Sequence, residues 1–421
     1  MAFQDIRKSR RWLSREEVVF LFLLLVLLGL LIAANIALAR VLPGGELFFL
    51  RWSGARAFLI EQIEPYSRTI AERVQEVAYG RQAFSSEYPY VLNDPFYIVL
   101  LYTPLALIPD FSVARGMWML FSEVALIGIL YLAVQLAEWT PPRWLFIALM
   151  GLGLFSYFAF QSLLSASPAI ILTFLYLSIL FALRSFSDEL AGALLFLTAY
   201  QWEAGGMFFL FMFLFIFANR RWRALAGFGM ALVVLLFVSF LVYPGWTLPY
   251  LRGVLSDWYR SSNLTFGSIL SFWFESIISS MSGWIYVVPG IVLLLEWIGS
   301  FNAHFRRVFW TASLSLALNP FMGFAIFPSN YVTLIPAFVL VIALVWERWT
   351  RHRLWLTAIL AAILFLFPYV LPFLRTGSNL RLISDLTSVL PPTVAIVGLY
   401  WMRWWATRSP RTWFDQIGGR A

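Results

Sequence analysis

The stretch from residue 43 to 67, PGGELFFLRWSGARAFLIEQIEPYS, carries the side chains best suited to chemistry. Glu46 lies where a long apolar run ends, so its carboxylate can face water and lipid head groups together. As a general base it could accept a proton from a substrate hydroxyl, a role worth roughly 10²–10⁴ in rate. The alternative is an interfacial charge that pairs with Arg51 or Arg56. We take Glu46 as the candidate general base.

Other side chains suit a substrate that carries phosphate and hydroxyl groups. Arginine holds phosphate through paired hydrogen bonds, and glutamine binds hydroxyls without a charge. For each arginine the alternative is ordinary head-group contact, and for a lone glutamine it is solvation at a helix end. The candidate substrate-binding residues are Arg51, Arg56, Tyr66, Gln161, Gln201, Glu203, Arg252 and Arg260.

Glu203 is unusual because it lies in an apolar hairpin, TAYQWEAGG. A charge at the centre of a membrane helix costs roughly 2.5–3.5 kcal/mol, so such a carboxylate is paired, neutral or functional. The structural alternative is hydrogen bonding to the hairpin turn or pairing with an arginine of the outer loop. The many aromatic residues of the chain are mostly packing and interface residues. A few could stack on sugar rings, namely Trp52, Tyr66, Trp202 and Trp258.

Composition restricts the class of protein. The chain has 421 residues, 61% hydrophobic and 12% charged, whereas soluble domains are about 45–50% apolar. It is therefore a polytopic membrane protein. There are no cysteines and two histidines, which leaves no zinc or haem signature, so any metal would need oxygen ligands. We predict no metal site and no required cofactor.

The charge distribution indicates topology. The net charge is +8, but the basic residues form short clusters between apolar runs, which is typical of cytoplasmic loops and not of nucleic-acid binding. Lys8 is the only lysine, so a lysine base or Schiff base is excluded. The basic N-terminal tail precedes an apolar run at 18–39 that is long enough to span and lacks a suitable cleavage site. We expect a retained anchor with a cytoplasmic N-terminus.

The apolar runs predict an all-α bundle of about 12 (11–13) membrane helices, with both termini cytoplasmic. The segment 95–109 is short and contains Pro104, so we expect it not to cross. One integral domain covers 1–421, with cytoplasmic tails at 1–17 and 407–421 and an outer loop of amphipathic helices at 41–92. The other predicted spans are 113–136, 144–160, 164–183, 190–202, 204–218, 224–243, 283–299, 311–327, 331–347, 353–373 and 387–406.

This topology places the unusual polar residues on one side of the membrane. The predicted outer segments are 41–112, the turns near Gln161 and at 201–206, the loop 244–282 with an amphipathic piece at 266–280, 328–331, and 374–386. We therefore expect an outward cavity where these segments meet. Neither a P-loop nor a dinucleotide motif is present.

Several segments together resemble family 87 glycosyltransferases, integral membrane enzymes of the GT-C fold. They are the first span with GGELFFLRWSGARAFLIEQIEPYS, the segment around Gln161, SDELAGALLFLTAYQWEAGG followed by NRRWRALAG, PGWTLPYLRG, and SNYVTLIPA. The similarity covers most of the chain in the same order. It implies a mannosyltransferase-like enzyme that takes a hexose from a polyprenyl-phosphate donor and passes it to a lipid or glycan acceptor at the outer face of the cytoplasmic membrane.

The resemblance also implies roles for residues. The transfer would be a single displacement, with Glu46 as base, outer arginines on the departing phosphate, and Gln161, Gln201 and Glu203 on sugar hydroxyls. However, Leu47 stands where the family has an aspartate. Either Glu46 acts from a shifted register, or catalysis is lost, or the base is one of Glu203, Asp94, Glu61 and Glu64. The family's Lys-Pro-Gln reads QWE here, so an arginine would have to replace the lysine at the phosphate.

Two other functions remain open. A non-enzymatic relative would keep the cavity as a lipid- or glycan-binding scaffold without the base. A secondary transporter predicts charged pairs at mid-membrane and inverted repeats, and the sequence shows neither clearly. The expected partners are membrane lipids, the lipid-linked donor and the acceptor.

Overall fold

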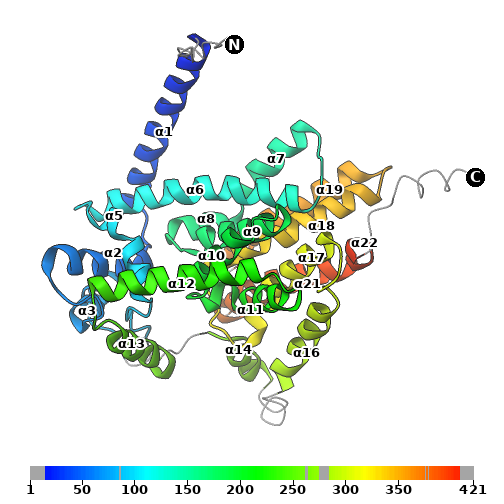
Figure 1. The fold of residues 1–421 in the computed structure, drawn as a ribbon. Helices are drawn as coiled ribbons and strands as arrows, with labels where there is room; N and C mark the ends of the chain where they lie inside the picture. The colour runs from blue at the N-terminus through cyan, green and yellow to red at the C-terminus, as the bar shows by residue number, and fades with distance from the viewer. Residues whose placement is uncertain are drawn as a thin grey trace, which may run out of the picture.

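The protein is all-α in a computed structural model that describes residues 15–84, 87–260, 264–274, 284–374, 376–377 and 379–407. Most helices pack into one body, and α1 projects from it (Figure 1). The N-terminal third contains α1 (Arg15–Val41), α2 (Glu46–Arg56), the π-helix η1 (Ala57–Glu61), α3 (Arg68–Tyr79), α4 (Phe96–Leu101), α5 (Thr103–Ala106), α6 (Phe111–Leu136), α7 (Arg143–Leu154) and α8 (Tyr157–Leu164).

The remaining helices complete the body. They are α9 (Ala169–Arg184), α10 (Asp188–Thr198), α11 (Trp202–Ala218), α12 (Trp222–Val242), α13 (Thr247–Arg260), α14 (Phe266–Trp273), α16 (Trp284–Ile298), α17 (Phe305–Leu318), η2 (Asn319–Met322), η3 (Pro328–Leu334), α18 (Ile335–Arg348), α19 (Arg353–Ala361), η4 (Ala362–Leu366), η5 (Phe367–Tyr369), α20 (Val370–Phe373), α21 (Leu380–Trp401) and α22 (Arg403–Thr407).

The structure contains fewer spanning helices than the sequence predicts. Among the described residues, six helices are long and apolar enough to cross a membrane, or seven if α7 and α8, bent by 46°, form one span. The predicted spans 164–183, 204–218 and 283–299 are apolar helices of 10–17 residues, below the ~20 that a bilayer requires. The prediction of about 12 spans therefore counted shorter helices. Several long apolar helices remain, as expected of a multi-pass membrane protein.

Burial differs among the apolar helices whatever their length. In the long run formed by η3 and α18, Pro328–Arg348, 94% of the apolar window is buried, and the shorter α17 is buried along most of its length. Such a helix is apolar because it is surrounded by other helices, and hydropathy alone cannot distinguish it from a lipid-facing span. The segment 95–109 forms α4 and α5, of six and four residues, which are too short to cross.

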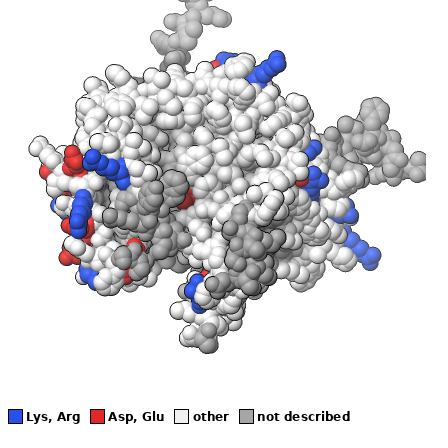
Figure 2. Space-filling model, turned by 90° about the horizontal axis from the view of Figure 1, so that it is seen from below, with Lys and Arg blue, Asp and Glu red and all other residues white. Residues whose placement is uncertain are grey.

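The basic residues between helices gather at one end of the body. Ion pairs there join the end of α6 to α9, the start of α10 to α12, α17 to α18, and α16 to α22: Arg184–Glu138, Arg221–Asp188, Arg306–Glu347 and Arg403–Glu296. On the face that Figure 2 shows, most charged side chains lie at the left and right edges, and most of the described residues between them are uncharged. This distribution suits a body embedded in a bilayer.

Of the outer-loop helices, which the sequence predicts to be amphipathic, α2 is buried on most of its sides, including Phe48 and Leu50–Ala55. Leu59 of η1 is 39% exposed. Leu59 is exposed because it lies in the π-turn η1, which widens the helix and rotates its side chains relative to those of α2. On α3, Ile70 and Val74 are buried. The predicted amphipathic piece at 266–280 begins as α14, and the part beyond Phe274 lies outside the described residues.

Two glycines allow α10 and α12 to cross closely. A Cβ on Gly227 would lie 2.1 Å from the backbone oxygen of Glu189, and one on Gly192 would lie 1.8 Å from that of Ala224. Neither backbone oxygen can rotate away. We expect Gly227→Ala to lower the stability by about 1–3 kcal/mol, the usual cost of overpacking.

The matched control for this substitution is on the same helix. A Cβ added to Gly229 would meet no atom within 4 Å, so Gly229→Ala should leave stability unchanged or raise it slightly through helix propensity. Thermal unfolding in detergent compares the two variants. Equal apparent unfolding temperatures would show that the α10–α12 crossing is looser than described.

Candidate functional site

A buried arginine sets the position of Glu46 and Leu47. Arg115 of α6 donates to the backbone oxygens of Ala39, Leu42 and Pro43 at 3.2, 2.9 and 3.3 Å, and also to that of Leu164. Gly45 has φ +89°, and a Cβ there would lie 2.9 Å from Arg115 Nε. Only glycine combines this conformation with this approach. The turn between α1 and α2 is therefore tied to α6 and α8.

Glu46 lies in the first turn of α2, half-buried. Burial and the nearby carboxylate of Glu46 raise the pKa of Tyr90 above its usual value. The next residue, Leu47, lines a separate polar cavity, described below, and Glu46 is not among the residues that line it. Thus Leu47, not Glu46, faces the space where the other candidate residues meet.

The centre of the site is a buried ion pair. Arg51 Nε donates to Asp94 Oδ2 at 2.6 Å, and Arg51 Nη2 donates to Asp94 Oδ1 at 3.2 Å. Arg51 is 6% exposed and Asp94 is 3% exposed. Burial alone would favour the neutral guanidine, but the charge of Asp94 outweighs it and raises the pKa of Arg51. Two-point geometry makes this one of the stronger kinds of ion pair.

The pair is connected to two other predicted residues. Arg51 Nη2 donates to Gln201 Oε1 at 3.4 Å, which brings the turn before α11 onto α2. The hydroxyl of Tyr66 donates to the backbone oxygen of Asp94 at 2.9 Å. Burial and the charge of Asp94 raise the pKa of Tyr66, so this hydroxyl stays protonated as a donor. Segments about 150 residues apart in sequence therefore meet at one ion pair.

We call the cavity beside this pair the polar pocket. Its volume is about 50 Å³, and its lining residues are Leu47, Leu50, Arg51, Tyr88, Asn93, Asp94, Ser167, Pro168, Tyr200, Gln201, Glu203, Phe327, Ser329 and Asn330. A water molecule occupies about 30 Å³ in the liquid. The pocket therefore has room for one or two waters, and a hexose would require its walls to separate.

Two buried donors in the wall of the polar pocket lack partners. Arg51 Nη1 and Asn330 Nδ2 have no hydrogen-bond partner among the described residues, and both residues are more than nine-tenths buried. A buried unpaired donor costs roughly 1–3 kcal/mol, more if it is charged. The pocket is thus suited to an oxygen-rich ligand that accepts hydrogen bonds from both groups.

Asn319 fixes the start of α11, where Glu203 lies. Asn319 Nδ2 donates to the backbone oxygens of Trp202 and Glu203 at 3.1 and 2.9 Å, and Asn319 Oδ1 accepts from Met207 N at 3.0 Å. These bonds bridge a kink at Gly205, where φ is −169° and ψ is 37°. The kink lies within the turn predicted at residues 201–206, and half-buried Glu203 lines the pocket beside it.

Several predicted residues lie outside the polar pocket. Arg56 donates to the backbone oxygen of Ala106 at 3.1 Å and lies over the Trp52 ring at 5.6 Å, which is a packing arrangement. Gln161 lies on α8, and its Oε1 is buried without a partner in the described part of the chain. Arg260 ends α13, and its side chain lies outside the described residues. Glu61 pairs with Arg73 at 2.7 Å on the surface.

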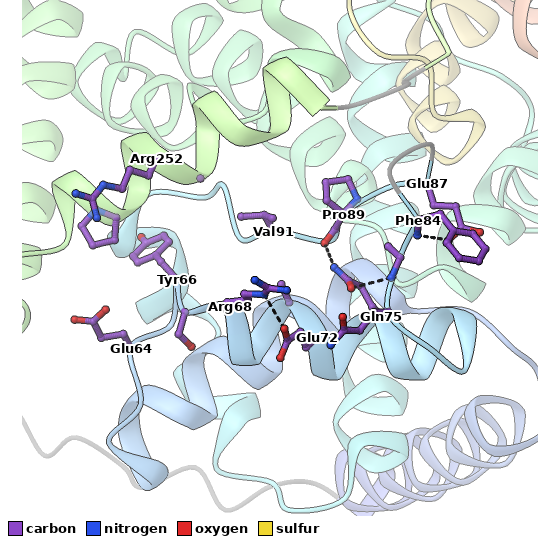
Figure 3. Close-up of a pocket in the computed structure, with 16 residues that line it drawn as sticks. Glu64, Tyr66, Arg68, Glu72, Gln75, Phe84, Glu87, Pro89, Val91 and Arg252 are labelled. Atoms are coloured by element: carbon purple, nitrogen blue, oxygen red, sulfur yellow. Dashed lines mark hydrogen bonds and ion pairs between the residues drawn. The ribbon is translucent and has the colours of Figure 1, made fainter.

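A second, larger hollow lies next to the polar pocket, and we call it the open cavity. Its volume is about 480 Å³, and its walls are α3, residues 82–84, residues 87–91 and α13 (Figure 3). It contains the predicted residues Tyr66 and Arg252, together with Glu64, Ser67, Arg68, Ala71, Glu72, Gln75, Gln82, Ala83, Phe84, Glu87, Pro89, Val91, Pro249 and Gly253.

The rim of the open cavity is held by hydrogen bonds. Gln75 Nε2 donates to Pro89 O at 2.6 Å, and Gln75 Oε1 accepts from Ala83 N at 3.0 Å. Arg81 binds both oxygens of Glu87 at 2.7 Å and lies 3.6 Å above the Phe84 ring. The cavity is therefore formed before any ligand enters, which lowers the entropic cost of binding.

The Arg81–Glu87 contact predicts a pH dependence of the rim. Hydrogen bonds from Arg81 and from Phe84 N lower the pKa of Glu87 to about 2. Because the pKa of Glu87 is lower in the folded protein than its usual value of 4.5, the Arg81–Glu87 contact stabilises the rim fully above pH 4.5. This stabilisation is lost as the pH falls toward 2. Pepsin, which works in this range and cuts beside Phe84, should cleave wild type more slowly than Glu87→Gln at pH 4. The two rates should converge near pH 2, and a constant ratio over the range would contradict this interpretation.

One extended segment separates the two cavities. Pro89 and Val91 line the open cavity, whereas Tyr88, Asn93 and Asp94 line the polar pocket. Gly253 of α13 packs on this segment so closely that a Cβ would lie 2.6 Å from Leu92 O. Residues 88–94 are thus a shared wall.

Within the part of the chain that the structure describes, no group of three or more acidic or histidine side chains could hold a metal.

Sequence reasoning assigned no role to Asn330 or Asn319. Asn330 lies in SNYVTLIPA, one of the segments that carries the family resemblance, and this was the available signal. Asn319 precedes Pro320 at the end of α17, and nothing in its sequence context indicates a bond to α11.

In comparisons with known proteins, no family model, no curated protein and no solved structure matches this chain.

Proposed function

We propose that this membrane protein is a glycosyltransferase that moves a hexose from a polyprenyl-phosphate donor to a lipid or glycan acceptor. The reaction would take place at the end of the body where the polar pocket lies, on the outer face of the cytoplasmic membrane. The observation that carries the proposal is the pair of unpaired buried donors, Arg51 Nη1 and Asn330 Nδ2, beside Glu203 and Gln201. Charged and amide donors next to a carboxylate suit an oxygen-rich substrate.

Glu203 is the best-placed general base in the described site. It lines the polar pocket and is half-buried. Asp94 also lines the pocket, but both of its oxygens accept from Arg51, so it is committed to the ion pair. Glu46 as base stays a prediction, and its absence from the pocket lining favours Glu203.

The proposed step is a single displacement. The acceptor hydroxyl oxygen attacks C1 of the donor sugar and forms the new glycosidic bond. The bond between C1 and the phosphate oxygen breaks, and its electron pair leaves with the polyprenyl phosphate. The Glu203 carboxylate takes the hydroxyl proton. Arg51 and Asn330 donate to oxygens of the sugar or the phosphate, and the charge on Arg51 stabilises the developing negative charge.

The test is a transfer assay with the full chain in lipid nanodiscs. Purified protein is incubated with a panel of polyprenyl-phosphate hexoses and with membrane lipid extract, and products are sought by mass spectrometry. We expect a product one hexose heavier than its acceptor, formed from one donor in preference to the others. No hexosylated product with any donor, from protein that is folded by circular dichroism, would contradict the proposal.

A non-catalytic scaffold is the second candidate. One observation favours it: Leu47, which stands where family 87 has its acid, lines the polar pocket. A scaffold would bind the lipid-linked sugar through Arg51 and Asn330 and release it unchanged. The two candidates differ in a single measurement, because both predict donor binding and only the enzyme predicts a transferred hexose.

A further inference from the structure

The open cavity has the dimensions of a ligand site. Its volume of about 480 Å³ lies within the roughly 300–1,000 Å³ of pockets that bind small molecules. The polar pocket is about a tenth of that size. The rim is fixed by Gln75 and by the Arg81–Glu87 pair, so the cavity does not depend on a ligand for its shape.

The charges in the open cavity favour a neutral ligand over an anionic one. Arg68 pairs with Glu72 at 2.7 Å, and Glu87 pairs with Arg81. Glu64, which accepts a hydrogen bond from Tyr243, and Arg252 have no ion-pair partner among the described residues, and Figure 3 shows them at the same end of the cavity on either side of Tyr66. A phosphate near Arg252 would also meet the carboxylate of Glu64, whereas a sugar can donate to one and accept from the other.

Other groups in the wall suit a carbohydrate. Tyr66 and Phe84 contribute aromatic rings, although Arg81 covers one face of Phe84. Gln82 contributes an amide, and the Ser67 hydroxyl has no hydrogen-bond partner among the described residues. Aromatic rings bordered by carboxylates and amides match the alternating apolar and hydroxyl surfaces of a sugar ring.

The helix α13 places the cavity at the membrane surface. Pro249, Arg252 and Gly253 line the cavity, while Leu248, Leu251 and Leu255 are 56%, 52% and 48% exposed on another face of the helix. An exposed leucine stripe beside a polar face is typical of a helix that lies in the lipid interface. A ligand in the cavity would therefore be at head-group depth.

We infer that the open cavity binds neutral sugar residues, and that these belong to the glycolipid acceptor. That the cavity binds sugar is inferred from the cavity alone. That the sugar belongs to the acceptor rests on the proposed function. Sugars bound here would lie across the shared wall, residues 88–94, from Glu203, so the attacking hydroxyl would belong to another part of the acceptor.

Binding without turnover tests the inference. Wild-type protein in nanodiscs is titrated calorimetrically with mannotriose, with a glycolipid carrying the same trisaccharide, and with inorganic phosphate. Ala83→Trp fills the cavity from its wall, and Val77→Trp is the matched control, since Val77 lies on the adjacent helix α3, is 59% exposed and does not line the cavity. We expect sugar affinity to fall at least tenfold in Ala83→Trp and to stay unchanged in Val77→Trp.

A second variant, Arg252→Ala, tests the inference even if Ala83→Trp does not fold. Arg252 has no ion-pair partner in the described part of the chain, so Arg252→Ala should fold normally and weaken sugar binding several-fold. Tighter binding of the glycolipid than of mannotriose would identify the membrane as the source of the ligand. No binding of either sugar at millimolar concentration, unchanged affinity in both cavity variants, or displacement of mannotriose by phosphate would overturn the inference.

The outcomes also separate the inference from the proposed function. One possible result is that Ala83→Trp weakens sugar binding while no hexose is transferred from any donor. This result would support the carbohydrate site and refute the proposed glycosyltransferase activity. Normal transfer by Ala83→Trp at the wild-type acceptor KM would refute the acceptor site and retain the enzyme.

Discussion

Replacing Glu203 by glutamine is expected to lower the rate of hexose transfer by about 10²–10⁴-fold, the usual contribution of a general base. The amide keeps the size of the side chain but cannot accept the hydroxyl proton. Because the backbone at Glu203 is held by Asn319, the fold and donor binding should be retained. The measurement is kcat with the donor identified in the transfer assay, together with donor Kd.

Glu46→Gln is the matched control for Glu203→Gln. Glu46 lies outside the polar pocket lining, so its amide variant should transfer hexose within a few-fold of wild type. The reverse result, with Glu46→Gln inactive and Glu203→Gln active, would return the catalytic role to Glu46 and require that α2 turns toward the substrate. Loss of donor binding in Glu203→Gln would show a binding role instead.

Asp94→Ala is expected to cause the largest loss of stability among single substitutions in the site. It leaves the Arg51 guanidinium buried without its counter-charge, and breaking a buried pair in this way costs about 3–5 kcal/mol. Tyr66 keeps its bond to the backbone oxygen at residue 94, so the effect reports the ion pair itself. Thermal unfolding in detergent should show a clearly lowered apparent unfolding temperature.

Two comparisons show whether burial is the cause of that loss. The double variant Arg51→Met with Asp94→Leu removes both charges and should be more stable than Asp94→Ala alone. Glu72→Ala breaks the exposed Arg68–Glu72 pair, where an i,i+4 pair contributes about 0.3–0.5 kcal/mol. If Asp94→Ala is no worse than Glu72→Ala, the Arg51–Asp94 pair is solvated and the polar pocket is open to water.

The sequence predicted the class of the protein and where its polar residues converge. Alternating apolar runs and basic clusters placed the turns before α9 and α11 and the loop before α4 at one end, and the structure brings Arg51, Gln201 and Glu203 together there. These three residues meet although the predicted number of spans was too high.

Other features could not be predicted from one sequence. The partner of Arg51 lies 43 residues away in an extended segment, and no periodicity links the two positions. Arg115 bonds to four backbone oxygens in distant segments, which any arginine in an apolar run could do. The number of spans was too high because an apolar run does not show where its helix begins and ends, and several predicted spans form helices of 10–17 residues.

The central claim is that substrate oxygens bind between Arg51 and Asn330 in the polar pocket. The most direct measurement is a cryo-electron microscopy map of the full chain in nanodiscs with the polyprenyl-phosphate hexose bound. We predict a widened polar pocket with ligand oxygens about 2.7–3.2 Å from Arg51 Nη1 and Asn330 Nδ2, and the Glu203 carboxylate on the same side of the shared wall. A donor bound elsewhere, with the polar pocket still closed around Arg51, would contradict the account.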